Sequence, residues 1–281
     1  MKLIHSIAEM HTPCRSAHSR GARLGLVPTM GALHEGHLSL IKAAHQKSDV
    51  VAASIFVNPT QFGPNEDFAK YPRTLEADCA LLEREGVELV FAPTVEEMYP
   101  KGAVTWVVVD GLSDRLCGKS RPGHFRGVTT VVAKLFHIVE PDFAFFGQKD
   151  AAQVAIIKHM VRDLNMPVAI EVCPIVREPD GLAISSRNAY LSPQERKSAL
   201  ILNRSLVQIQ KLFDEGERDS AKLIAAARQV FSTEPAVRLD YIEVVNPETL
   251  EVETTVIKRA LAAVAAFVGQ TRLIDNVVLE P

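Results

Sequence analysis

The first 175 residues alternate short apolar runs with helix-like segments. The clearest run is Val50–Val57, which reads VVAASIFV and ends at Asn58-Pro59. A parallel strand is covered by helices on both faces and is apolar throughout, whereas a strand with one solvated face alternates apolar and polar residues. Right-handed crossovers between parallel strands give a doubly wound sheet. This part of the chain therefore predicts a Rossmann-like α/β fold.

The remaining elements are predicted by the same criteria. Strands are expected at Leu24–Pro28, Val50–Val57, Leu89–Ala92, Val104–Val109, Phe143–Phe146 and Val168–Cys173. Helices are expected at Leu38–Gln46, Leu75–Glu85, Val128–Val139 and Ala151–Leu164.

The pattern changes after Val176. Two expected helices precede three expected strands, in the order Pro193–Phe213, Ser220–Phe231, Leu239–Val245, Ala260–Val268 and Leu273–Val278. Helices followed by strands are typical of an α+β domain. We therefore expect a doubly wound domain over residues 1–175 and a smaller α+β domain over residues 176–281. The turn-forming stretch Glu178–Gly181 is the expected hinge.

Charge and cysteine content limit the class of protein. The formal net charge of −3 argues against general binding to nucleic acid. Met1–Met10 lacks the apolar core of an export signal, and the longest apolar run, Ala260–Gly269, is too short to cross a bilayer. The four cysteines lie far apart, without a C-x-x-C pair, at Cys14, Cys79, Cys117 and Cys173. We expect a cytoplasmic protein with reduced thiols and no membrane partner.

Two histidines, His34 and His37, follow the first strong strand in the string VPTMGALHEGH. Ligands of doubly wound sheets bind beyond the carboxyl ends of the strands, and the N–H groups that open a helix attract anions. A histidine there can donate a hydrogen bond to a phosphate oxygen. Zinc binding would favour H-E-x-x-H spacing, which is absent. Polar residues at a helix start, or a simple turn at Gly31 and Gly36, remain alternatives.

Two further groups follow other strands. Asn58 and Gln61 come just after Val50–Val57, and the Gln61 amide suits hydroxyl and carboxylate groups. A polar turn is the alternative. Lys149 and Asp150 join the strand ending at Phe146 to a helix, where Asp150 can act as N-cap and Lys149 can meet a phosphate.

Two more polar stretches lie away from these strand ends. Ser185, Ser186 and Arg187 form a compact set of donors for an oxyanion, or else a polar loop before a helix. Residues 118–127 form a basic turn, for which RNA is one possible ligand.

Together these strings resemble the pantoate–β-alanine ligase (pantothenate synthetase) family, which carries H-x-G-H and belongs to the nucleotidyltransferase superfamily. The resemblance covers nearly the whole chain and is densest over residues 24–78, 118–153 and 174–196. It implies ATP-dependent condensation of pantoate with β-alanine through a pantoyl adenylate, giving pantothenate, AMP and pyrophosphate. It also implies Mg²⁺ on the phosphates and a homodimer.

The resemblance also implies site residues. Those matching ATP contacts are Met30, Gly31, Ala32, Leu33, His34, Glu35, Gly36, His37, Gly147, Gln148, Lys149, Asp150, Val176, Ile184, Ser185, Ser186 and Arg187. Those expected to assist the reaction are His37, His34, Lys149, Ser185, Ser186 and Arg187. Those expected to bind the small substrates are Gln61, Gln153, Asn58 and Arg121. Asp78 is a candidate for Mg²⁺, but Ala77 stands where some relatives have an acid, so no metal ligand is assigned.

Three other functions remain possible at this stage. Another adenylating enzyme of the superfamily would share the histidine loop without needing the paired glutamines or the Ser-Ser-Arg loop. A non-catalytic nucleotide-binding regulator would have lost at least one phosphate-contact string. RNA binding would rest on residues 118–127 alone.

Overall fold

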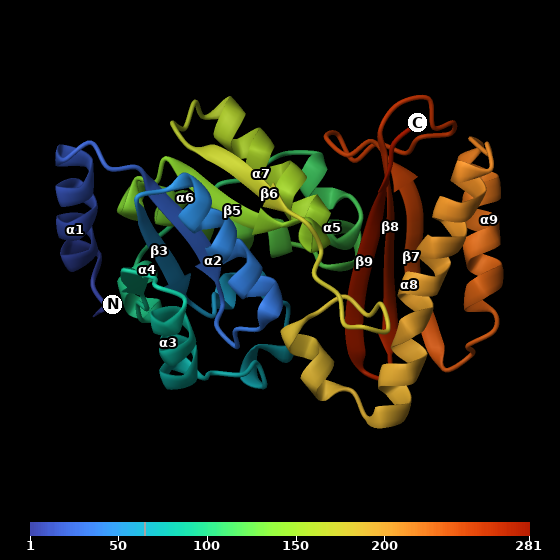
Figure 1. Ribbon diagram of the computed structural model, residues 1–281, viewed down its shortest axis with the longest axis horizontal. Coiled ribbons are helices and arrows are strands. Elements are labelled where there is room, and N and C mark those ends of the chain that lie inside the picture. The colour runs from blue at the N-terminus through green and yellow to red at the C-terminus, as the bar shows by residue number, and fades with distance from the viewer. Residues whose placement is uncertain (65) are drawn as a thin grey trace. The chain divides into compact units, whose positions relative to one another are not determined.

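The structure is a computed structural model that describes residues 1–64 and 66–281. It divides into two compact units, each of which is described by itself (Figure 1). The first unit contains Met1–Ser113, Arg121–Gly147 and Ile156–Pro174, and the second contains Asp114–Ser120, Gln148–Ala155 and Ile175–Pro281. Because the second unit takes two short segments from the first 175 residues, the functional domains 1–175 and 176–281 stay a prediction.

The first unit is built on a six-stranded parallel sheet in the order β1-β4-β3-β2-β5-β6. Its strands are β1 (Lys2–Ile4), β2 (Leu24–Thr29), β3 (Val50–Ile55), β4 (Leu89–Phe91), β5 (Phe143–Gly147) and β6 (Ala169–Cys173). The predicted doubly wound fold is confirmed. The strand order reverses at β2, which lies between β3 and β5, so the carboxyl ends of these strands are where such a sheet binds ligands.

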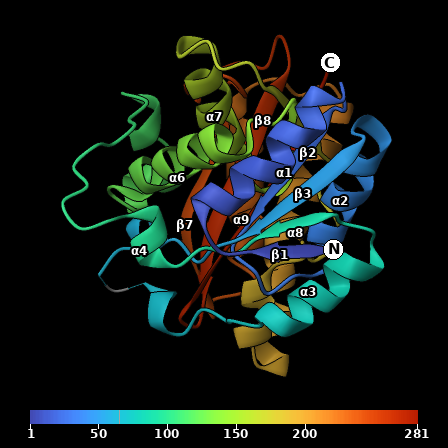
Figure 2. The same ribbon diagram turned by 90° about the vertical axis from the view of Figure 1, so that its left-hand side faces the viewer.

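Helices cover both faces of this sheet. On one face α2 (Glu35–Lys47) and α3 (Leu75–Arg84) share an apolar core with the strands. On the other face α1 (Ile7–Ser19) and α6 (His124–Val139) pack against each other and against β2 (Figure 2). Helix α7 (Ala151–Asp163) follows β5, and the short α4 (Val95–Met98) follows β4. Burial on both faces explains why the strands are apolar throughout.

In this unit the sequence analysis omitted two elements and predicted one strand that is not formed. Strand β1 was not predicted because its three residues are too few to show an alternating pattern. Helix α1 was not predicted because Pro13 lies inside it, and proline usually interrupts a helix. The expected strand Val104–Val109 is not formed, and the segment lies outside both sheets. Its main chain bonds to helix α6 instead, where Thr130 Oγ1 accepts from Val107 N–H and Thr129 Oγ1 donates to Val107 O.

The second unit contains an antiparallel sheet of β7 (Val237–Val245), β8 (Ala260–Val268) and β9 (Thr271–Leu279), with β8 in the centre. Two helices, α8 (Pro193–Asp214) and α9 (Ser220–Phe231), pack against the sheet around one apolar core. A third, α5 (Cys117–Ser120), is short. The predicted α+β architecture is therefore confirmed. A capping box between Ser192 and Glu195 begins α8.

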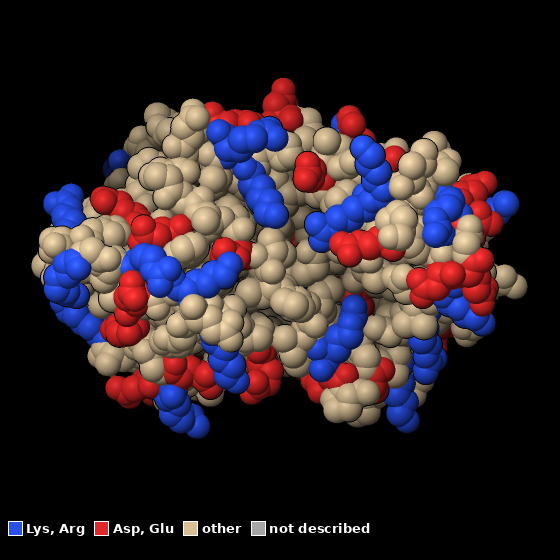
Figure 3. All heavy atoms as spheres, turned by 45° about the horizontal axis from the view of Figure 1, so that its top comes forward, with Lys and Arg blue, Asp and Glu red and all other residues tan. Residues whose placement is uncertain are grey.

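The surface carries charges of both signs. On the face drawn in Figure 3, Lys and Arg side chains alternate with Asp and Glu side chains rather than forming one basic surface. Over the described residues no helix is long and apolar enough to span a membrane. None of the four cysteines, all of which the structure describes, forms a disulfide.

Candidate active site

The two histidines of the H-x-G-H string meet at the first turn of α2. His34 is the N-cap residue, and its backbone N–H donates to His37 Nδ1 at 3.3 Å. The two imidazole rings lie 4.1 Å apart between centroids and are tilted by 33°. A Cβ at Gly36 would lie 3.0 Å from His34 Cε1 and Nδ1, so glycine leaves room for this ring. The i,i+3 spacing therefore places both imidazoles at a helix N-terminus, which favours anions.

Asp78 fixes the loop that leads to these histidines. Its carboxylate is 2% exposed and accepts hydrogen bonds from Ala32 N–H at 2.9 Å and Leu33 N–H at 2.8 Å. Thr74 Oγ1 donates to it at 3.1 Å. Ala32 has a φ of 50°, a left-handed conformation that costs an alanine free energy and needs support. Asp78 is therefore a positioning residue for the loop, and its candidacy for Mg²⁺ stays a prediction.

Asn58 is held by hydrogen bonds inside the first unit. It is 1% exposed, and its Oδ1 accepts from Thr60 Oγ1 at 2.9 Å and from Tyr99 Oη at 3.0 Å. Its Nδ2 donates to Gln61 Oε1 at 3.0 Å and to Gly127 O at 3.1 Å. Because both ends of the amide are engaged inside the protein, Asn58 has a positioning role in this structure, and its expected substrate contact stays a prediction.

Gln61 lies beside the histidine loop in the first unit. It closes a short 3₁₀ turn, Pro59–Gln61, and its Nε2 donates to Met30 Sδ at 3.0 Å. Gly127 of α6 allows this turn to approach closely, since a Cβ there would lie 2.4 Å from Thr60 O. A substrate gripped by Gln61 would thus lie next to the segment that carries Met30 and His34.

Arg121 is already paired. Its Nε and Nη2 each lie 2.6 Å from an oxygen of Glu66, and Nη2 also donates to Gln61 O at 3.3 Å. Burial raises the pKa of Glu66, but hydrogen bonds and the positive charge of Arg121 outweigh burial and hold the pKa below its usual value. Another cation of the basic turn, Arg126, lies over the Trp106 ring at 4.6 Å. The cations of this turn therefore act separately, and Arg121 supports the Gln61 turn.

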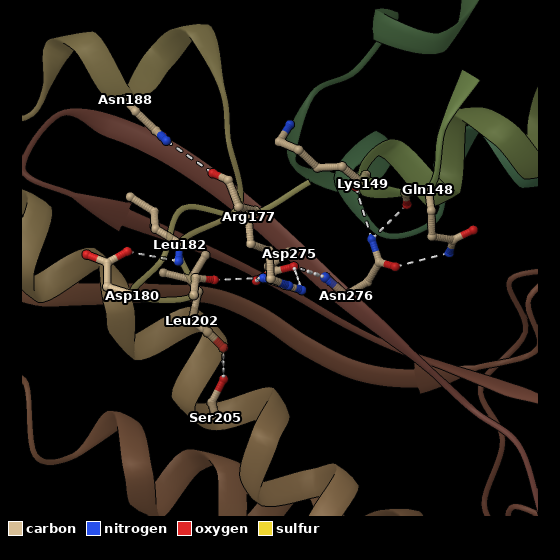
Figure 4. Close-up of polar contacts among 12 residues, drawn as sticks. Gln148, Lys149, Arg177, Asp180, Leu182, Asn188, Leu202, Ser205, Asp275 and Asn276 are labelled. Carbon is tan, nitrogen blue, oxygen red and sulfur yellow. Dashed lines mark hydrogen bonds and ion pairs between the residues drawn. The ribbon is translucent and has the colours of Figure 1, made fainter. Parts of the chain in front are cut away.

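In the second unit the loop after β5 is held on β9. Asn276 Nδ2 donates to Gln148 O and Lys149 O, both at 3.0 Å, and Gln148 Nε2 donates to Asn276 Oδ1 at 3.1 Å (Figure 4). The Lys149 side chain is 22% exposed, and its Nζ lies 3.6 Å from the Asp150 carboxylate. Gln153 follows in the first turn of α7 and is half-buried. The backbone at Lys149 is thus fixed while its ammonium group can reach a ligand.

The Ser-Ser-Arg string follows a short two-stranded ribbon in the same unit. Ile184 N–H donates to Val176 O at 3.0 Å and closes the ribbon. Ser185 then caps a 3₁₀ turn, with its Oγ accepting from Arg187 N–H at 3.3 Å. The structure therefore gathers His34, His37 and Gln61 in one unit, and Lys149 and the Ser185–Arg187 loop in the other.

Comparisons with known proteins show the family of this chain. The family model for pantoate-beta-alanine ligase matches residues 2–278. The pantothenate synthetase of Koribacter versatilis is 60% identical over 280 residues, which cover 100% of this chain and 96% of the relative. The chain belongs to the pantoate–β-alanine ligase family.

Solved structures of pantoate–β-alanine ligases share the fold. The Thermus thermophilus pantothenate synthetase superposes with a TM-score of 0.95 at 46% identity, covering 100% of both chains. The Francisella tularensis ligase, solved in complex with β-γ ATP and β-alanine, gives 0.82 at 36% identity over 99% of this chain and 97% of that one. The resemblance predicted from the sequence is confirmed. The chain is accordingly an enzyme, an ATP-using ligase of pantothenate biosynthesis.

Sequence reasoning missed the residues that hold the site in place. Asp78 was considered only for a metal, and Glu66, Arg177 and Asn276 were assigned no role. Each is buried or half-buried and pairs with a site segment. The one signal for Asn276 was that the family resemblance returns at residues 272–276. The contacts of the individual site residues with ligands stay predictions.

Proposed function

We propose that the chain condenses pantoate with β-alanine in two steps. The pantoate carboxylate attacks the α-phosphorus of ATP, an oxygen–phosphorus bond forms, and the bond to the pyrophosphate oxygen breaks. The β-alanine amine then attacks the acyl carbon of pantoyl adenylate, AMP leaves, and the amine loses a proton to give pantothenate. The observation that carries this proposal is 60% identity over the full chain, together with the histidine pair at the start of α2.

We propose that His34 and His37 stabilise the charge that develops on the α-phosphate and on the departing pyrophosphate. The reaction needs no protein nucleophile, because the substrate carboxylate and then the amine attack. Catalysis therefore depends on positioning and on fixed donors. The first turn of α2 adds its N–H groups to the two imidazoles, so several donors face the same region.

Lys149, Ser185, Ser186 and Arg187 are proposed to hold the triphosphate. A lysine ammonium is a compact, mobile cation, whereas the arginine guanidinium can bind two phosphate oxygens at once. Gln61 and Gln153 are proposed to bind the hydroxyl and carboxylate groups of pantoate, since an amide both donates and accepts.

Mg²⁺ is proposed to enter with ATP. No group of three or more His, Cys, Asp or Glu side chains suited to a metal ion is present among residues 1–64 and 66–281. We propose that the ion is held mainly by phosphate oxygens and water, as Mg²⁺ often is. When bound, the ion neutralises phosphate charge. Lys149 and Arg187 would hold the phosphates on the protein.

One assay tests the proposed function. The purified full chain is incubated with ATP, Mg²⁺ and labelled pyrophosphate, with and without pantoate. We expect label to enter ATP only with pantoate, and AMP to be released once β-alanine is added. Exchange that requires a different carboxylate would identify another adenylating enzyme of the superfamily. Lack of exchange with any carboxylate would favour a nucleotide-binding regulator.

Replacing Gln61 by alanine is expected to weaken pantoate binding selectively. Loss of an amide that grips two substrate groups should raise the KM for pantoate about tenfold or more, since each hydrogen bond contributes roughly 0.5–1.5 kcal/mol. The KM for ATP should change much less. Steady-state kinetics with each substrate varied in turn measures both constants. An unchanged KM for pantoate would contradict the assignment.

We also propose that the chain is a homodimer in the cytoplasm. The segment Val104–Val109 supports an interface between copies, because Val104, Trp106 and Val108 expose 82%, 40% and 56% of their surface. The chain should elute at about twice its mass of 30.8 kDa in size-exclusion chromatography with light scattering. Val108→Asp should shift this mass toward the monomer. Val207→Asp, at a valine equally exposed on α8, should leave it unchanged. Equal masses for both variants would remove this segment from the interface.

A further inference from the structure

Two neighbouring polar residues of strand β9, Asp275 and Asn276, are buried although much of the strand is only partly buried. Each is 3% exposed. Strand β9 is at the edge of the three-stranded sheet and pairs with β8 only. Consecutive side chains of a strand point to opposite faces, so one strand can reach two separate segments. Buried polar groups cost free energy unless they are hydrogen-bonded, so their partners are informative.

Asn276 holds the Lys149 loop by three hydrogen bonds. Its Nδ2 donates to both Gln148 O and Lys149 O, and its Oδ1 accepts from Gln148 Nε2 (Figure 4). The Asn276 side chain therefore both donates hydrogen bonds to the loop and accepts one from it. An amide is needed here, because a carboxylate at this position could not donate to the two carbonyl oxygens.

Asp275 holds the ribbon that leads to the Ser185–Arg187 loop. Arg177 Nη1 and Nη2 donate to its two oxygens at 2.6 and 2.9 Å, a two-bond geometry that fixes direction as well as distance. Arg177 also donates to Gly181 O at 3.0 Å, at the turn of the ribbon. Asp275 Oδ1 accepts in addition from the Asn276 backbone N–H at 2.8 Å. The ribbon is thus tied to β9 at the residue next to the one that ties down the Lys149 loop.

We infer that Asp275 and Asn276 are positioning residues. They fix the Lys149 loop and the Ser185–Arg187 loop relative to each other, so that both can hold the phosphates of ATP. This inference rests on the proposed function of those two loops. Asp275 and Asn276 act through backbone carbonyls and through Arg177, and because they are adjacent in one strand, the two loops cannot move independently at their anchor points.

Two variants of the full-length protein test this inference. Asn276→Ala removes three hydrogen bonds to the Lys149 loop, and Asp275→Asn removes the charge that orients Arg177. We expect each to raise the KM for ATP about tenfold or more, the scale of one to two lost hydrogen bonds. The KM for pantoate should stay within about twofold in the exchange assay, because a local shift of phosphate ligands is not a loss of the pantoate site.

A destabilised variant of the same unit is the matched control. Asp219 caps α9 by accepting from Ala221 and Lys222 N–H, away from either loop. Asp219→Ala should lower the Tm without changing the KM for ATP. If the Asn276 and Asp275 variants lower the Tm and leave the KM for ATP unchanged, they are merely structural and the inference is wrong.

The outcomes separate this inference from the proposed function. Pantoate-dependent exchange by the native chain tests the function, and only the variants test the anchors. Should Asp275→Asn fail to fold because Arg177 is left unpaired, Asn276→Ala, which leaves no charge unpaired, decides the matter. A normal KM for ATP in that folded variant overturns the inference.

Discussion

Replacement of His37 by alanine is expected to lower the rate of pantoate-dependent pyrophosphate exchange about 10²-fold or more. This is the scale of one lost donor to a transition-state oxyanion. His37 lies at the first turn of α2, with its ring 4.1 Å from that of His34, so its loss removes one of two adjacent donors. Exchange rates under saturating ATP and pantoate measure the effect on the chemical step.

The control for this variant lies on the same helix. His45, in the last turn of α2, also makes a hydrogen bond, from Nε2 to Glu85 O at 2.9 Å. His45→Ala therefore loses a comparable contact far along the helix from the loop and should keep nearly native turnover. Circular dichroism should show that both variants are folded. Near-native exchange by a folded His37→Ala protein would remove His37 from the reaction.

Replacement of Asp78 by alanine is expected to destabilise the fold and abolish most activity together. The buried carboxylate accepts from the N–H groups of Ala32 and Leu33 and from Thr74. A group left without a partner costs about 1–3 kcal/mol, and three donors lose theirs, so the free energy of unfolding should fall by roughly 3 kcal/mol or more. Without this support the loop before His34 loses its conformation. Urea unfolding and exchange kinetics measure the two effects.

An exposed aspartate of the same unit provides the comparison. Asp49 accepts from Arg23 N–H at 2.8 Å at the surface, and the hydrogen bonds from Arg23 lower the pKa of Asp49. Asp49→Ala should change both the urea midpoint and the exchange rate little, because solvent replaces the lost partner. An Asp78→Ala protein as stable and active as the Asp49→Ala protein would show that the histidine loop keeps its shape without a buried carboxylate.

Some elements could be predicted to the residue. Strand β8, Ala260–Val268, and helix α9, Ser220–Phe231, have the expected bounds, because each is an uninterrupted pattern between clear end signals. The prediction of a strand at Val104–Val109 was wrong for a physical reason. A run of β-branched residues favours an extended backbone, but a strand also needs a neighbouring strand, and here helix α6 supplies the hydrogen-bond partners instead.

The candidate site was predictable where it is local in sequence. The H-x-G-H string places two histidines one turn apart, and the strings at Lys149 and Ser185–Arg187 lie within a few residues of element ends. The roles of Asn58 and Arg121 were harder to predict, because both side chains carry the polar groups expected of a ligand contact. Only the structure reveals that Asn58 is buried and that Arg121 forms an ion pair with Glu66.

The amino-acid sequence by itself determined the family, the doubly wound fold and the histidine pair. This was possible because periodicity and short motifs involve residues that are close together in the sequence. The tertiary structure alone decided what holds those residues in place. Asp78 meets Ala32 across 46 positions, and Asn276 meets Gln148 across 128. A buried polar group forms hydrogen bonds with groups that the fold places next to it. Because these groups are distant in the sequence, no local sequence pattern predicts them.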